Sequence, residues 1–156
     1  MREKILIVDD EMGARAALEF LLRREGFEVR DAPDGRTAIA ECATFRPDLI
    51  LLDIMMPGMD GCALVRALKH SAATKHIPTI MISALDDHAT RMSAFSAGAE
   101  EYLTKPVDRA ELSLRVRNLV RLKSNADYHD RYGQMLETAV GVRKAGRGAG
   151  GIGNLC

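Results

Sequence analysis

Short apolar segments alternate along this chain with longer segments of helical periodicity. Ile5–Val8 and Leu49–Leu52 are apolar at every position, which is typical of parallel strands buried on both faces. We expect strands at residues 5–8, 27–32, 49–52, 79–82 and 101–104, and helices at 12–24, 37–45, 63–68, 87–97 and from 108 onward. This alternation predicts an α/β fold, (βα)5, in which helices cover both faces of a doubly wound, five-stranded parallel sheet.

The composition is that of an ordinary globular protein. A length of 156 residues is enough for about one domain, and 22 basic against 22 acidic residues argue against a protein that coats nucleic acid. The three cysteines include no C-x-x-C pair, so neither a disulfide framework nor a zinc site is indicated and a cytoplasmic location is expected. No apolar run approaches the roughly 18 residues of a membrane span, so no membrane partner is expected.

Polar residues follow four of the five expected strands. Asp9 and Asp10 follow the first strand, Asp53 follows the third, Ser83 the fourth and Lys105 the fifth. The carboxyl ends of parallel strands meet at one edge of a sheet, where open α/β proteins bind their ligands. We therefore expect these five residues to form the functional site.

The chain around these residues resembles the receiver domain of two-component response regulators over about residues 3–122. The matching elements are D-D at 9–10, D-x-x-M-P-G-x-D-G at 53–61, S-A at 83–84 and K-P at 105–106. None of them is specific alone, but their common order and spacing leave little room for coincidence. The resemblance implies the flavodoxin-like strand order 2-1-3-4-5, with an extended C-terminal helix.

That strand order makes the first and third strands neighbours, about 4.8 Å apart. Asp9, Asp10 and Asp53 then crowd together, and their charges repel one another unless a cation neutralises them. Carboxylates are hard ligands, so Mg²⁺, or Mn²⁺ in its place, is favoured over zinc. The resemblance implies that Asp10 and Asp53 hold the ion, that Asp9 binds it directly or through water, and that the backbone carbonyl of Met55 adds a further protein ligand.

The resemblance also implies what the site does. Asp53 would be the phosphoacceptor, taking a phosphoryl group from the phosphohistidine of a sensor histidine kinase or a phosphotransfer protein. Lys105 would pair with a phosphoryl oxygen, and Ser83 would hydrogen-bond another. Tyr102 would turn as Ser83 moves, changing the surface of the fourth helix, fifth strand and fifth helix toward an output domain or downstream protein. Such a protein assists its own phosphorylation and dephosphorylation but is not an enzyme acting on other molecules.

Two other functions compete with this interpretation. A pseudo-receiver would serve only for binding and dimerisation, but the complete set of acceptor, acids and lysine argues against it. An aspartyl-phosphate phosphatase of the haloacid dehalogenase class needs a second acid two residues after its nucleophile, and Met55 occupies that position. No helix-turn-helix pattern follows the receiver-like part, so direct nucleic-acid binding is not expected.

The C-terminal part of the chain carries weaker patterns. We expect a receiver domain at 1–122, a helical extension or linker at 123–140, and a flexible tail at 141–156, which holds six of the thirteen glycines. A weak heptad pattern over 122–140 leaves a coiled-coil stalk of a homodimer and a frayed amphipathic helix both open. Such an exit resembles the N-terminal piece of a larger regulator, for example one with a cyclic-di-GMP enzyme domain, but a stand-alone regulator would look the same.

Overall fold

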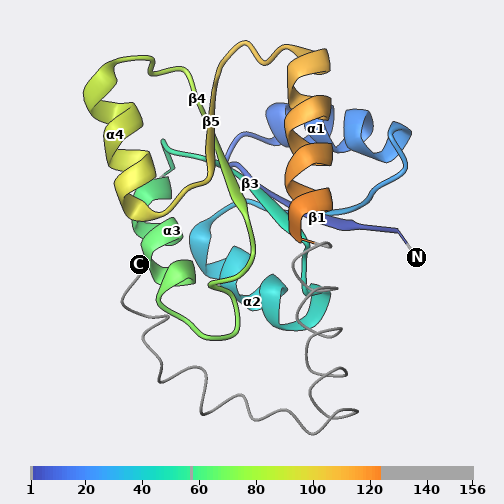
Figure 1. Cartoon of the computed structure of the whole chain (residues 1–156), viewed down its shortest axis with the longest axis horizontal. Helices are drawn as coiled ribbons and strands as arrows, with labels where there is room; N and C mark the ends of the chain where they lie inside the picture. Colours follow the sequence, from blue (N-terminus) through green and yellow to red (C-terminus); the bar gives the residue numbers. More distant parts are fainter. Residues whose placement is uncertain (1, 57, 124–156) are drawn as a thin grey trace, which may run out of the picture. The chain divides into compact units, whose positions relative to one another are not determined.

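The computed structural model describes residues 2–56 and 58–123. Its parallel sheet has the strand order β2-β1-β3-β4-β5, which confirms the expected fold (Figure 1). The strands are β1 (Lys4–Val8), β2 (Glu28–Ala32), β3 (Leu49–Asp53), β4 (Thr79–Ser83) and β5 (Glu101–Thr104). The helices are α1 (Met12–Arg24), α2 (Gly35–Phe45), α3 (Gly61–Lys69), α4 (His88–Ala97) and a C-terminal helix over residues 109–123.

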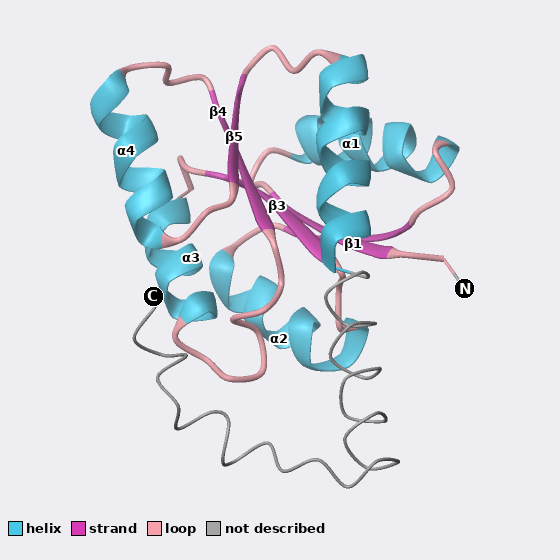
Figure 2. Cartoon of the chain, viewed as in Figure 1, coloured by secondary structure: helices cyan, strands magenta, loops and turns pink. Residues whose placement is uncertain are grey.

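The apolar strands supply two separate cores because alternate side chains point to opposite faces of the sheet. Leu6 and Val8 pack in one core with residues of α2, α3 and α4. Ile5 and Ile7 pack in the other core with residues of α1 and the C-terminal helix. Figure 2 shows these two helical layers on either side of the sheet. The doubly buried strands therefore explain why the apolar segments have no polar alternation.

Four helices have an acidic N-cap residue, which lies in the loop between the carboxyl end of a strand and the start of the helix. Glu11, Asp34, Asp60 and Asp87 are N-cap residues, and each side chain accepts a hydrogen bond from a backbone N–H in the first turn of its helix. The Asp34 cap lets α2 begin at Gly35, two residues before the expected start. Sequence periodicity cannot reveal this because the first turn of the helix has no apolar pattern.

The strand β1 begins one residue earlier than expected, at Lys4, and two strands extend one residue further at their carboxyl ends. Asp53 is the last residue of β3 and pairs with Ile82, and Ser83 is the last residue of β4 and pairs with Thr104. Because the side chains at these positions are polar, a prediction based on apolar runs ends both strands one residue too early. The backbone of both residues therefore belongs to the sheet rather than to the following loop.

The compact unit that carries the sheet is Met1–Arg121. The predicted linker at 123–140, apart from Lys123, and the predicted tail at 141–156 lie outside the described residues, as does the expected stalk apart from Leu122 and Lys123. Within residues 2–56 and 58–123, no helix combines the length and apolar character needed to cross a membrane.

Candidate functional site

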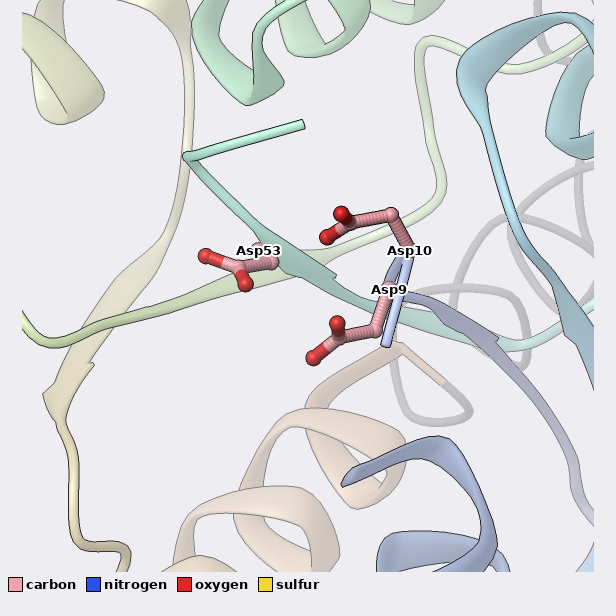
Figure 3. Close-up of side chains that lie close together, drawn as sticks. All are labelled: Asp9, Asp10 and Asp53. Atoms are coloured by element: carbon pink, nitrogen blue, oxygen red, sulfur yellow. The ribbon is translucent and has the colours of Figure 1, made fainter. Parts of the chain in front are cut away.

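Three carboxylates gather where β1 and β3 end. Asp9, Asp10 and Asp53 each offer an oxygen, and these oxygens lie within 4.8 Å of one another. All three side chains extend to the same side of the strand ends (Figure 3). Asp9 is 3% exposed and Asp53 is 8% exposed, whereas Asp10 is open to solvent. The structure therefore brings together the three acids that the sequence placed at neighbouring strand ends.

The two buried carboxylates are held in the same way. Asp9 Oδ1 accepts a hydrogen bond of 2.9 Å from the N–H of Glu11, and Asp53 Oδ1 accepts one of 3.1 Å from the N–H of Met55. Each acid thus binds the backbone two residues ahead, as aspartate commonly does in turns. This leaves Oδ2 of both residues to face Lys105.

Lys105 directly follows β5, the edge strand that β4 separates from β3, and its side chain joins the acids. Its Nζ atom lies 3.1 Å from Asp53 Oδ2 and 3.5 Å from Asp9 Oδ2. Partial burial alone would lower the pKa of Lys105, but the hydrogen bond to Asp53 and the charges of Asp53 and Asp9 outweigh it and raise the pKa. The ammonium group is therefore firmly charged at neutral pH.

The charges at this site favour a cation. Three carboxylates face one ammonium group, which can balance only one of them. Two like charges at this separation repel by roughly 3 kcal/mol at the effective dielectric constant of a protein surface. The donor atoms are hard oxygens, and the exposed side of Asp10 leaves room for metal-bound water. The residues thus fit Mg²⁺ or Mn²⁺, with Asp9, Asp10 and Asp53 as the side chains that would hold it.

Ser83 and Tyr102 are both hydrogen-bonded to the backbone of one residue, Leu85, in the loop after β4. Ser83 is fully buried, and its Oγ accepts a hydrogen bond of 3.0 Å from the N–H of Leu85. The Tyr102 hydroxyl donates to the carbonyl of the same residue, and its ring lies in the core. A displacement of either side chain would therefore disturb the backbone at Leu85.

The methionines after Asp53 divide between the loop surface and the core. The Met55 side chain is 60% exposed, while Met56 is buried and Met59 packs against the core. The N–H of Met55 donates to Asp53. The role of the Met55 backbone carbonyl as a metal ligand stays a prediction.

Gly61 allows α3 to approach the end of β3. A Cβ atom at this position would lie 2.4 Å from the Asp53 carbonyl oxygen and 2.8 Å from the Cα of Ile54. The N–H of Gly61 donates to the Ile54 carbonyl at 2.8 Å. Any side chain here would collide with the backbone that carries Asp53. The close approach of these two segments therefore requires glycine at position 61.

Arg15 also contacts the acidic site, although the sequence patterns did not single it out. Its Nη1 donates to the backbone carbonyl of Asp9 at 2.7 Å, and its Nε pairs with Asp31 at 3.2 Å. Arg15 therefore fixes the turn after β1 to the end of β2. Helical periodicity marks only the apolar face of α1, so it carries no signal for an arginine on the loop side.

A largely apolar groove of about 550 Å³ adjoins the acids. Its walls come from α1 and from the segment that follows β5, and they include Leu18, Phe20 and Val107. Glu11 and Lys105 line the groove at its site end. Phe20 is 64% exposed, which is unusual for a side chain of this size.

The match with known proteins agrees with this geometry. Residues 5–117 match the family described as the response regulator receiver domain. The chain belongs to this family. The expected family and fold are both confirmed, and receiver domains of response regulators are signalling proteins that interact with histidine kinases and output domains.

Two curated relatives and a solved structure illustrate the similarity. The chain is 47% identical over 123 residues to the response regulator PleD of Caulobacter vibrioides, covering 79% of this chain and 27% of PleD. It is 42% identical over 125 residues to the transcriptional regulatory protein ResD of Bacillus subtilis, covering 80% of this chain and 51% of ResD. A CheY-like receiver domain protein of Methanospirillum hungatei superimposes with a TM-score of 0.75 at 25% identity, covering 81% of this chain and 99% of that one. The matched part thus spans about a quarter and about half of the two curated relatives.

Proposed function

We propose that this receiver domain is a switch that accepts a phosphoryl group on Asp53 from a phosphohistidine. The observation that carries the proposal is the joint placement of Asp53 beside Asp9, Asp10 and Lys105. A buried carboxylate that has one oxygen bound to backbone and the other beside an ammonium group is held in place as a nucleophile. We also propose that the protein is located in the cytoplasm.

The transfer makes one bond and breaks another. A carboxylate oxygen of Asp53 attacks phosphorus and forms a P–O bond, while the P–N bond to the donor imidazole breaks and the electron pair leaves with the imidazole. Lys105 stays protonated and pairs with a phosphoryl oxygen in place of Asp53 Oδ2. Bound Mg²⁺ would supply the charge that shields the acids from the incoming phosphoryl group. Ser83 offers a hydroxyl to a further phosphoryl oxygen.

The backbone of Leu85 links that chemistry to the surface. Once the Ser83 hydroxyl turns to the phosphoryl group, it no longer accepts from the N–H of Leu85, and the loop that also holds Tyr102 is free to move. The Tyr102 ring then turns, and the surface formed by α4, β5 and the C-terminal helix changes. That surface would act on an output domain or a downstream protein, and a homodimer is one arrangement in which it would do so.

The apolar groove is the proposed docking surface for the phosphohistidine-bearing partner. Its occupant must reach Asp53, and the groove runs directly to Lys105, which pairs with Asp53. A partner helix with apolar side chains would cover Phe20 and Val107 and would place its histidine near the acids. Removing the Phe20 ring would therefore slow transfer from a protein donor without affecting a small one.

Phosphorylation with a small donor tests the function. Incubation with Mg²⁺ and phosphoramidate is expected to add the mass of one phosphoryl group to the parent chain and none to Asp53→Asn. Asp60→Asn is a matched control, because Asp60 caps α3 in the same loop and asparagine caps helices equally well. Absence of the adduct from the parent, or its persistence in Asp53→Asn, would overturn the proposal.

A protein donor tests the groove. With a phosphotransfer protein that phosphorylates the parent, Phe20→Ala is expected to slow transfer about tenfold or more, as truncated aromatic anchors commonly do. The same variant should react with phosphoramidate at the parental rate. Ile39→Ala removes an exposed apolar side chain from α2 and should change neither rate. Equal transfer to Phe20→Ala and the parent would show that the donor docks elsewhere.

A further inference from the structure

Asp9 and Asp10 lie in a turn that belongs to no regular element. The strand β1 ends at Val8 and the helix α1 begins at Met12, whereas the third acid, Asp53, is itself part of β3. A metal site binds tightly only when its ligands are already held close to their binding geometry. Contacts other than those of a regular strand or helix must therefore hold the two acids of this turn.

The backbone of Asp9 is held from two sides. Its N–H donates to the Ala32 carbonyl at 3.1 Å, and its carbonyl accepts a hydrogen bond of 2.7 Å from Nη1 of Arg15. Within the part of the chain that the structure describes, no other side chain bonds to the Asp9 backbone. Arg15 is therefore the side chain that anchors the turn after β1.

Asp10 depends on the same anchor, because its own side chain makes no hydrogen bond or ion pair with any residue that the structure describes. Its carboxylate is open to solvent, so its position follows from the backbone that carries it. The carbonyl of Asp9 and the N–H of Asp10 belong to one planar peptide unit. The hydrogen bond from Arg15 to that carbonyl therefore orients the peptide from which the Asp10 side chain extends.

Arg15 is in turn fixed to the sheet. Its Nε lies 3.2 Å from Asp31 Oδ2, and its side chain is only 15% exposed. Asp31 belongs to β2 and pairs with Ile7 of β1. Because a guanidinium group is planar and donates in fixed directions, its two hydrogen bonds connect the Asp9 carbonyl rigidly to the second strand.

We propose that Arg15 is a positioning residue of the metal site, which raises the affinity of the three acids for Mg²⁺ or Mn²⁺ by fixing the peptide between Asp9 and Asp10. This inference rests on the proposed function, because Mg²⁺ binding belongs to it. Arg15 donates to a backbone carbonyl and to Asp31 and to none of the three clustered carboxylates. It therefore acts on the ion through the turn.

Charge and position predict opposite effects for the removal of this arginine. A cation beside the acids competes with the metal ion, so a role through charge alone would make the metal bind more tightly once Arg15 is lost. Loss of the anchor instead releases the Asp10 backbone and weakens binding, as the loss of partners that orient metal ligands commonly does. Asp31 already pairs with the guanidinium group, so the loss of the anchor outweighs the loss of charge.

Mn²⁺ binding to the full chain tests the proposal, with the free ion measured by electron paramagnetic resonance. Arg15→Met removes the donors and keeps a side chain of similar length, and it should raise the Kd for Mn²⁺ by about tenfold. Arg15→Lys keeps the charge but not the planar pair of donors, so it should raise the Kd by a smaller factor. Arg30→Met is the matched control, because Arg30 of β2 pairs with Glu41 instead, and its Kd should equal that of the parent. Circular dichroism verifies folding, and Arg15→Lys carries the test if Arg15→Met does not fold.

Phosphorylation by phosphoramidate separates metal binding from the reaction itself. In Arg15→Met, the Mg²⁺ concentration that gives half the maximal rate should rise by about tenfold, while the maximal rate changes much less. A loss confined to the maximal rate would mean that Arg15 acts on phosphoryl transfer and not on the metal, and it would overturn the proposal.

Failure of this inference and failure of the proposed function give different results. A folded Arg15→Met that binds Mn²⁺ as tightly as a phosphorylated parent chain does, or more tightly, would overturn only the positioning role. Equal weakening in Arg30→Met would show a general charge effect and would also overturn that role. Weaker Mn²⁺ binding confined to the Arg15 variants, in a parent that phosphoramidate does not modify, would uphold Arg15 and overturn the phosphoryl switch. A parent that binds no Mn²⁺ would overturn both.

Discussion

Two lysine–carboxylate pairs of nearly equal length lie at opposite edges of the same sheet. At the amino edge, Lys69 Nζ lies 3.0 Å from Glu100 Oε2, and at the carboxyl edge Lys105 Nζ lies 3.1 Å from Asp53 Oδ2. Glu100 also accepts hydrogen bonds from the N–H and hydroxyl of buried Thr79. The amino-edge pair is one lysine with one acid, whereas at the carboxyl edge Lys105 pairs with Asp53 and Asp9, and Asp10 adds a third carboxylate to the cluster.

This comparison shows that charge balance, rather than the presence of an ion pair, distinguishes the site. At the amino edge the contacts of Glu100 with Lys69 and Thr79 support β4, β5 and α3 against one another. At the carboxyl edge the acids repel one another, and in the proposed function that repulsion is the source of affinity for a cation. The balanced pair at the amino edge therefore stabilises the fold, whereas the unbalanced acids at the carboxyl edge reduce stability and would serve the proposed function.

The largest expected effect concerns the backbone at the carboxyl edge. Gly61→Ala should lower the free energy of unfolding by about 3 kcal/mol, because the new methyl group meets the Asp53 carbonyl and the structure must shift. Urea denaturation measures it. Gly13→Ala is the control, since only Glu11 Oε1 lies near at 3.6 Å, and it should be neutral or stabilising. Equal stability of the two variants would mean that the contact at Gly61 is not tight.

The second-largest expected effect is the stabilisation of the folded protein by Mg²⁺, which should depend on the carboxyl edge and not on the amino edge. At a hundredfold excess over its Kd, a ligand that binds only the folded state raises the free energy of unfolding by about 2.7 kcal/mol. We expect this gain in the parent and in Glu100→Ala, and its loss in Asp10→Asn. Urea titrations with and without Mg²⁺ provide the measurement. An undiminished gain in Asp10→Asn would remove Asp10 from the ligand set.

Without metal, single replacements at the two edges should have effects of opposite sign. Glu100→Ala should destabilise the protein by about 2 kcal/mol, because the N–H of Thr79 is left buried without its acceptor. Asp10→Asn should stabilise it by about 1 kcal/mol, because it relieves repulsion among the acids. The same sign for both variants would contradict the comparison.

The smallest effect belongs to an exposed ion pair, away from both edges. Arg117 and Ser113 of the C-terminal helix hydrogen-bond Glu25 at the end of α1, and these bonds lower the pKa of Glu25 below its ordinary value of 4.5. The stabilisation is therefore complete above pH 4.5 and is lost as the pH falls through the lowered pKa. Thermal midpoints of Glu25→Gln and the parent should differ slightly at pH 7 and converge in acid. A difference that persists in acid would assign the effect to packing instead.

Several interactions at the site were beyond prediction from the sequence. The joint placement of Asp53 and Lys105 was predictable from the strand ends and the implied strand order, but their direct pairing at 3.1 Å, across 52 residues of chain, was not. Arg15 and Arg91 lie on helices whose periodicity defines only the buried face. Their contacts with the Asp9 carbonyl and the Tyr102 ring depend on how the helices pack.

The sequence by itself determined the alternating elements and the polar residues at the strand ends. It could do so because burial on both faces imposes an apolar run, and the covalent order then fixes which side chain comes next. Only the tertiary structure decided which of these charges are balanced, which residue's backbone joins Ser83 to Tyr102, and which arginine covers that ring. Those outcomes depend on distances between segments far apart in the chain, and local patterns carry no information about such distances.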